Sequence, residues 1–213
     1  MYKYDIRSFK ELSLYIASDL YRYMTSTSLK SFLRGWYIAG FRYTFFMRCC
    51  RFFGKRGIAY KPLFFLCRIA LRHYSIKYGF QLPWQTDIGP GLMIGHYGPI
   101  IVNPNSRIGV NCNITVGVLM GLSHKLNEDN SRGGFLYPEI GDRISLGNNS
   151  KIIGGVKIGS GSIIGVSSVV TKDIPANSVV VGIPAKIISQ QGSSAYVGSF
   201  HPWTKTAFGN ETE

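Results

Sequence analysis

Four histidines are the side chains of this sequence best suited to proton transfer near neutral pH: His73, His96, His124 and His201. Two kinds of catalysis that occur on folds built from coils of short strands need different numbers of histidines. A catalytic zinc site needs three neutral imidazoles that converge, and the chain has no repeated set of histidines to supply them. Acyl transfer to a hydroxyl needs a single general base. The histidine count therefore favours one-base acyl transfer, and no metal is expected.

The four cysteines also give no metal site. Cys49 and Cys50 are adjacent and cannot easily bridge each other, and the sequence contains no CxxC pair. Cys67 and Cys112 stand alone. We expect a reducing compartment, with all four side chains buried as small hydrophobic groups.

An aliphatic residue recurs at every sixth position through much of the chain, with glycine beside most of these residues. This period is too short for a helical repeat and does not fit an amphipathic strand, but it suits a coil with three flat faces of short parallel strand. We expect a mainly β fold, a left-handed parallel β-helix, over residues 81–188. A β-sandwich with glycine-rich turns is the alternative, but its turns would be more widely spaced. The repeated positions are Ile88, Ile94, Ile100, Ile108, Ile114, Ile140, Leu146, Ile152, Ile158, Ile164 and Val170.

Glycine and asparagine mark the corners of this coil, because both tolerate a positive φ. Gly109-Val110-Asn111 and Gly147-Asn148-Asn149 are the clearest examples. Between Ile114 and Ile140 the period of six fails, and residues 122–138 are polar and contain glycine. We interpret this segment as an extended loop, and loops of this length in a compact domain are usually functional or disordered.

Residues 1–80 form a separate basic, aromatic region that we expect to be helical over 28–53 and 62–78. It carries 15 Lys and Arg against 3 Asp and Glu, whereas residues 81–213 carry 9 against 8. Gly54, Gly57 and Pro62 separate the two predicted helices. Neither helix has the 18 or so uncharged apolar residues of a membrane span. The first residues lack the apolar stretch of a signal peptide, so we expect a cytoplasmic protein.

The aromatic residues of this region have two interpretations. They could lie on the inner face of an anionic cell membrane through residues 28–78, or they could cap the coil and pack between subunits. Nucleic acid is not an expected partner, because no recognised nucleic-acid module accompanies the basic residues. The residues in question are Trp36, Tyr37, Phe41, Tyr43, Phe45, Phe46, Phe52 and Phe53.

Residues 78–188 resemble the hexapeptide-repeat acyltransferases. The closing segment VTKDIPANSVVVGIPAKII is highly specific to that superfamily, and the segments with IGPGLMIGHYGPIIV and PEIGDRISLGNNSKIIGG are similar to its serine-acetyltransferase-like branch in capsule and exopolysaccharide gene sets. The resemblance implies a homotrimer that uses acetyl-coenzyme A.

The same resemblance implies site residues. His96 of MIGHYGPIIV matches the general base of serine acetyltransferases, and His124 lies where galactoside and maltose acetyltransferases carry theirs. Serine acetyltransferases place an orienting Asp where this chain has Gln81, and a second His where it has Tyr137. Asp87 is close to Gln81 in the sequence, but it does not fall at the position of the orienting Asp. We expect Tyr137 and Asp87 to contact the acceptor. These departures favour a sugar hydroxyl over serine as the acceptor.

Acetyl-coenzyme A in these enzymes lies along a groove between adjacent coils of two subunits, held mostly by backbone groups. Lys172 and Lys186 are the expected partners of its phosphates, although either could be an ordinary surface lysine. The full set of expected contacts is Asn148, Val166, Thr171, Lys172 and Lys186.

The sequence therefore predicts an acetyl-coenzyme A-dependent O-acetyltransferase that acts on a sugar hydroxyl of a surface polysaccharide or of its lipid-linked precursor. Serine O-acetylation for cysteine synthesis is the first alternative, and a non-catalytic trimeric scaffold on the same coil is the second. Residues 189–213 form a tail that either packs across a neighbouring subunit or stays mobile.

Overall fold

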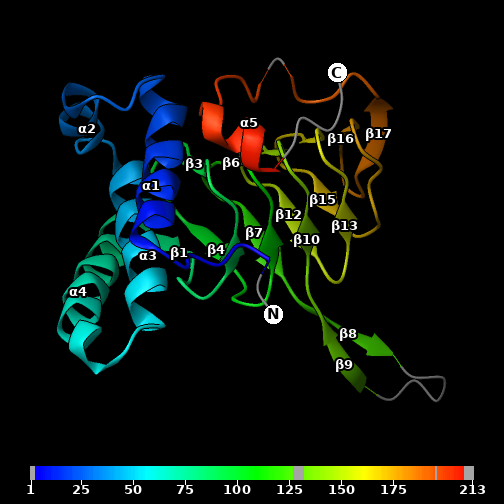
Figure 1. Cartoon of the computed structure of the whole chain (residues 1–213). Coiled ribbons are helices and arrows are strands. Elements are labelled where there is room, and N and C mark those ends of the chain that lie inside the picture. The colour runs from blue at the N-terminus through cyan, green and yellow to red at the C-terminus, as the bar shows by residue number, and fades with distance from the viewer. Residues whose placement is uncertain (1–2, 127–131, 195, 209–213) are drawn as a thin grey trace.

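The computed structural model describes residues 3–126, 132–194 and 196–208, and it places a helical region against one end of a three-sided parallel β-helix (Figure 1). The helices of this region all precede the first strand in the chain. The helical region comprises α1 (Phe9–Met24), α2 (Leu29–Gly35), α3 (Ala39–Gly54), a 3-10 turn (Ile58–Tyr60) and α4 (Lys61–Tyr78).

The helices differ from the sequence prediction at two places. The predicted helix over 28–53 is two helices, because the chain turns at Trp36–Ile38 between α2 and α3. Helix α1 was not predicted, although its start carries a capping signal: Ser8 Oγ accepts a hydrogen bond from Glu11 N at 3.1 Å, and the Glu11 carboxylate accepts one from Arg7 N. Gly79 ends α4 with a φ of 77°.

Three parallel faces make up the β-helix. The first face contains β2 (Asp87–Ile88), β5 (Arg107–Ile108), β10 (Glu139–Ile140) and β13 (Lys157–Ile158). The second contains β3 (Met93–Ile94), β6 (Asn113–Ile114), β11 (Ser145–Leu146), β14 (Ile163–Ile164), β16 (Val179–Val181) and the antiparallel β17 (Lys186–Ser189). The third contains β1 (Phe80–Gln81), β4 (Ile100–Val102), β7 (Leu119–Gly121), β12 (Lys151–Ile153) and β15 (Val169–Val170).

The aliphatic residues of the six-residue repeat form the inner ladder of this coil, as predicted. All eleven positions from Ile88 to Val170 are at most 3% exposed. The ladder also contains Met120, which is 1% exposed and lies six residues after Ile114. The coil therefore continues in period as far as Met120, and the interruption begins only after it.

The predicted corners are confirmed. Asn111 and Asn149 have φ values of 58° and 59°, in the left-handed region that asparagine tolerates. Gly147 is required for a different reason: a Cβ there would lie 2.7 Å from the carbonyl oxygen of Ile164 on the next coil. Glycine at this repeated position thus allows successive coils to approach each other closely.

The segment predicted to be an extended loop is instead an antiparallel hairpin, as far as it is described. It consists of β8 (Ser123–Leu126) and β9 (Arg132–Leu136), and it projects from the side of the β-helix (Figure 1). The tip of the segment lies outside the described residues. Backbone pairing between the two strands satisfies groups that an open loop would have to leave to water.

The described part of the tail packs on its own chain. Strand β17 pairs with β16, and helix α5 (Pro202–Phe208) lies against α1 and the β-helix (Figure 1). Trp203 contacts Tyr15 with ring centroids 5.8 Å apart, and Asn111 Nδ2 donates to Thr204 Oγ1 at 3.2 Å.

Three of the eight aromatic residues for which we considered membrane contact or packing are buried in the helical region. Phe41, Tyr43 and Phe52 are at most 2% exposed, while Tyr37 is 86% exposed. The prediction that the cysteine side chains are buried is confirmed for Cys49, Cys50 and Cys112. Cys67 is only partly buried.

A buried ion pair joins the helical region to the first coil. Arg48 Nε and Nη2 donate to the two carboxylate oxygens of Asp19 at 2.9 and 3.1 Å, and both side chains are at most 2% exposed. Arg48 also donates to the carbonyl oxygens of Ile88 and Gly89. Asp19 Oδ1 in turn accepts from the backbone N–H groups of Gly91 and Leu92. Burial raises the pKa of Asp19, and the Arg48 guanidinium and these N–H groups oppose that shift.

Replacement of Arg48 by Met should lower the free energy of unfolding by about 3–5 kcal/mol, because it leaves the Asp19 carboxylate buried without its cation. Chemical denaturation followed by circular dichroism measures the loss. The matched control is Lys55→Ala: the Lys55–Asp5 pair at 2.7 Å is about a third exposed, and its loss should cost less than about 1 kcal/mol. Equal costs for the two variants would contradict the structural role assigned to Arg48.

Candidate functional site at the edges of the third face

The edge between the second and third faces brings together three of the predicted site residues. Ile94, Leu146 and Ile164 are aligned by strand pairing through Ile114. Two residues after each of these positions the chain turns onto the third face, and the residues there are stacked on successive coils. They are His96, Val116, Asn148 and Val166, which we call the His96 edge.

The turn that carries His96 is held from both sides, while its side chains face solvent. Gly95 N donates to the carbonyl oxygen of Ile114 at 2.8 Å, and Gly98 N donates to that of Tyr78, at the end of α4, at 2.8 Å. Both His96 and Tyr97 are exposed. Among the described residues, none hydrogen-bonds the His96 imidazole, which leaves both ring nitrogens open to an incoming group.

The edge between the third and first faces carries a second set of predicted residues. Strand pairing aligns Met120, Ile152 and Val170. Thr171 and Lys172 follow Val170 on this edge and are exposed, directly in line with the root of the hairpin, which follows Met120. We call this the hairpin edge. In one copy of the chain the structure thus separates Thr171 and Lys172 from His96 by the width of the third face.

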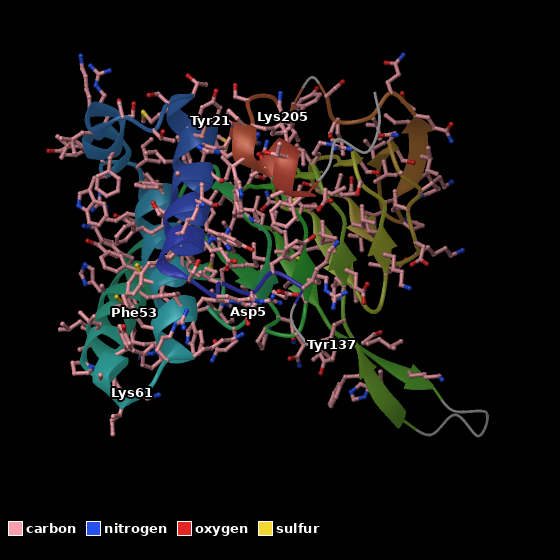
Figure 2. The ribbon with its side chains drawn as sticks, in the orientation of Figure 1. Asp5, Tyr21, Phe53, Lys61, Tyr137 and Lys205 are labelled. Carbon is pink, nitrogen blue, oxygen red and sulfur yellow. The ribbon has the colours of Figure 1, made fainter. Side chains whose placement is uncertain are left out.

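His124 and Tyr137 both belong to the hairpin edge. His124 pairs with Phe135 across the hairpin, with ring centroids 4.6 Å apart, and its Nδ1 is buried without a hydrogen-bond partner among the described residues. Tyr137 is half-buried at the junction of hairpin and coil (Figure 2), with its ring centroid 6.4 Å from that of Phe135. The structure therefore brings these two predicted residues together, away from His96 of the same chain.

Asp87 is engaged in internal contacts, which argues against its predicted contact with the acceptor. It is 5% exposed on the first face, away from both edges. Its oxygens accept from the backbone N–H groups of Lys3 and Tyr4 at 2.8 and 3.0 Å, and from Arg51 at 3.0 Å. Arg107 Nε lies 3.4 Å from Oδ2. These contacts indicate that Asp87 anchors the N-terminal segment to the coil.

Lys186 and Gln81 lie at opposite ends of the β-helix. Lys186 is exposed on β17 and pairs with Val181, one residue after the last ladder position of the second face. It therefore lies near the far end of the His96 edge. Gln81 pairs with Ile101 on the third face and lines a cavity of about 290 Å³ beneath α4.

Two residues of the His96 edge were missed by the sequence analysis. Val116 lies directly between His96 and Asn148 in the stack, and Tyr97 is 72% exposed beside His96. The period of six, extended two positions past Ile114, contained the signal for Val116. Tyr97 has no such signal, because its exposure depends on how the turn is held by α4.

At the edge between the first and second faces, a cavity of about 620 Å³ lies beneath the tail. Its lining includes Arg143, Asn177, Ser193 and Lys205. It lies away from both edges that carry the predicted site residues. Within residues 3–126, 132–194 and 196–208, no group of three His, Cys, Asp or Glu side chains is placed to hold a metal ion.

No family model matches the chain, but individual relatives do. A serine acetyltransferase of Mycobacterium tuberculosis is 35% identical over 129 residues, which cover 61% of this chain and 54% of that protein. One from Bacillus pumilus is 31% identical over 132 residues, or 62% of this chain and 58% of that protein. The chain thus spans a little over half the length of these curated relatives.

Solved serine acetyltransferases have the same fold. The crystal structure from Neisseria gonorrhoeae in complex with serine matches with a TM-score of 0.64 and 26% identity, covering 85% of this chain and 71% of that one. The structure from Brucella abortus matches with a TM-score of 0.68, 24% identity, and coverage of 87% and 72%.

The fold defined by the three faces is therefore the left-handed parallel β-helix of the hexapeptide-repeat transferases. Within that class, the chain is similar to serine acetyltransferases. These relatives and solved structures give no support to the capsule and exopolysaccharide branch that the sequence indicated.

The hairpin should be dispensable for folding, because its described residues lie outside the inner ladder. Replacing residues 123–136 by a short Gly-Asn-Gly linker should change the free energy of unfolding by less than about 1 kcal/mol. Gly147→Ala is the comparison, since its Cβ would lie 2.7 Å from a carbonyl oxygen, and it should cost more. Loss of cooperative unfolding in the linker variant, measured by denaturation, would show that the hairpin is part of the folding core.

Proposed function

We propose that the chain is an acetyl-coenzyme A-dependent O-acetyltransferase with His96 as its general base. The observation that supports this most directly is the stacking of exposed His96 above Asn148 and Val166 on one edge of a fold shared with serine acetyltransferases. The thioester supplies an activated acetyl group. His96 takes the proton of the acceptor hydroxyl as its oxygen attacks the acetyl carbonyl, and the departing thiolate is then protonated.

The donor would lie along the His96 edge. Asn148 and Val166 offer a polar side chain and an apolar surface on the two coils after Val116, and Val166 is 67% exposed. Lys186, near the far end of the same edge, would meet phosphate groups of the donor as a point charge. This run of exposed and half-buried residues on consecutive coils fits an extended nucleotide thioester better than a compact ligand.

Thr171, Lys172, His124 and Tyr137 would enter the site from another copy of the chain. They occupy the hairpin edge, which one copy cannot bring to His96. In a closed ring of three copies, the His96 edge of one copy adjoins the hairpin edge of the next through a head-to-tail interface. We therefore propose a homotrimer with three composite sites.

Serine is the proposed acceptor. The relatives are named serine acetyltransferases, and one solved relative was crystallised in complex with serine. This reverses the order of the sequence predictions, in which a sugar acceptor came first. Serine presents the primary hydroxyl that a base of this kind can deprotonate.

A sugar hydroxyl is the second candidate. Tyr137 stands where the serine enzymes are expected to carry a histidine, and Gln81 where they carry an aspartate. Tyr137 lies beside Phe135, which is 54% exposed, so the hairpin root offers an aromatic surface. A neutral acceptor such as an oligosaccharide suits that surface better than a zwitterion does.

His96→Ala should lower kcat by roughly 10²–10⁴-fold and leave the affinity for acetyl-coenzyme A within about twofold, because the base acts on the acceptor proton. Release of the coenzyme thiol measures turnover, and calorimetry measures donor binding. The matched control is His73→Ala, which changes an exposed histidine on α4. Full activity in His96→Ala, with activity lost in His124→Ala instead, would assign the base to His124.

The acceptor is tested by thiol release with serine and with neutral oligosaccharides in parallel, followed by mass spectrometry of the product. Acetylserine, with no acetylated sugar, is the expected result. Acetylated sugar with no acetylserine would instead establish a sugar hydroxyl as the acceptor. Absence of donor binding, together with no transfer to either acceptor, would favour the non-catalytic scaffold.

A further inference from the structure

The outward face of helix α4 carries a group of exposed apolar side chains. Phe65, Ile69 and Ile76 are 60%, 69% and 72% exposed. They are spaced as i, i+4 and i+11, which places all three on one stripe of the helix. Leu66, 64% exposed, widens the stripe on one side. Such side chains usually face a protein core or an apolar partner, and within the described chain these four do not.

Cations flank this stripe, and no acidic residue accompanies them. The sequence has no Asp or Glu between residues 20 and 86. Arg72 falls on the stripe itself, seven residues after Phe65, and Arg68 lies next to it on the side opposite Leu66. Both arginines are exposed, as are Lys61 and Lys77 at the two ends of the helix. Figure 2 shows Lys61 at the end of the helical region farthest from α2.

A cavity with both polar and apolar lining residues adjoins the stripe on its cationic side. It has a volume of about 290 Å³, and its lining includes Arg68, Arg72, Ser75 and Gln81. The two arginines therefore border both the apolar stripe and a recess that could receive an anionic group. Guanidinium groups suit phosphate because they donate in a planar fork.

A second copy of the chain does not fit this surface well. In a two-fold contact each patch meets itself, so Arg68 and Arg72 would face the same cations with no carboxylate between residues 20 and 86 to compensate. A partner that is negatively charged and apolar at once satisfies both features. An anionic lipid bilayer has phosphate at the depth of its head groups and acyl chains just below.

We propose that α4 docks on the surface of an anionic phospholipid bilayer and lies parallel to it. Phe65, Ile69 and Ile76 enter the boundary between head groups and acyl chains, while Arg68 and Arg72 contact lipid phosphates. The helix rests on the membrane rather than crossing it, because no helix of the described chain is long and apolar enough for a span. The proposed membrane surface is α4, which lies within the predicted 28–78 region, and it differs from the aromatic cluster of Trp36 to Phe53 on which that prediction was based.

Cosedimentation of the full-length chain with vesicles tests the proposal. The wild-type chain should bind vesicles of phosphatidylglycerol and phosphatidylcholine, bind pure phosphatidylcholine at least about tenfold more weakly, and lose most binding at high salt. The triple variant Phe65→Ser, Ile69→Ser, Ile76→Ser should bind the anionic vesicles at least about tenfold more weakly. So should the charge reversal Arg68→Glu, Arg72→Glu. All these residues are exposed, so circular dichroism should show an unchanged fold.

Ile188→Ser is the matched control, because Ile188 is 63% exposed on β17 and away from the helical region. It should bind vesicles as the wild type does. Equal binding of the triple variant and the wild type would overturn the proposal, as would absence of binding to anionic vesicles. Dissociation of the assembly by the triple variant in sedimentation velocity, without any vesicle binding, would assign the face to a protein contact. Inorganic phosphate at millimolar concentration should not displace the vesicles.

Discussion

The structure depends on one constraint, which is that an aliphatic side chain must point into the coil at every sixth residue. The inward ladder from Ile88 to Val170 is almost completely buried, so its hydrophobic stabilisation is lost if any coil slips in register. Fixed register also fixes the turns. His96, Val116, Asn148 and Val166 are stacked because the ladder residues two positions before them are paired. A packing requirement thereby aligns the residues of the proposed site along one continuous edge.

A parallel coil has an open end, and the helical region covers it. The backbone groups of the first coil that no preceding strand can pair find partners in helix side chains. Arg48 donates to the carbonyl oxygen of Ile88 at 2.7 Å, and Tyr23 Oη donates to that of Ile94 at 3.0 Å. Tyr43 Oη donates to Leu82 O at 2.8 Å, and burial raises the pKa of Tyr43 to about 12, which keeps this donor protonated. Because the same end carries His96, the helices also support the turn that presents the imidazole.

The sequence predicted those parts of the molecule that repeat. The ladder and the corners at Asn111 and Asn149 follow from a local period that the fold preserves, whereas His96, Asn148 and Val166 were predicted from the resemblance to known acyltransferases. The hairpin was missed because its strands pair only with each other, so the six-residue repeat of the coil does not predict them. The engagement of Asp87 could not be predicted either, since its partners Lys3 and Tyr4 are more than eighty residues away.

The separation of the predicted site into two edges is the result that changes the functional account most. Each edge follows from the periodic coil. In the proposed homotrimer the two edges meet only where two copies of the chain adjoin, and no local sequence pattern encodes that contact. Under this proposal acetyl transfer depends on assembly, and a variant that lacks either His96 or the hairpin should be inactive alone.

Subunit complementation tests this claim most directly. A chain with His96→Ala and a chain with the hairpin replaced by a linker are co-expressed in equal amounts, and the mixed assembly is assayed for acetyl transfer. If each site takes one edge from each of two copies, roughly a quarter of the sites in a random mixture combine two intact edges, and activity reappears to that extent. Activity no higher than that of either variant alone, in an assembly shown to contain both chains, would contradict the composite site.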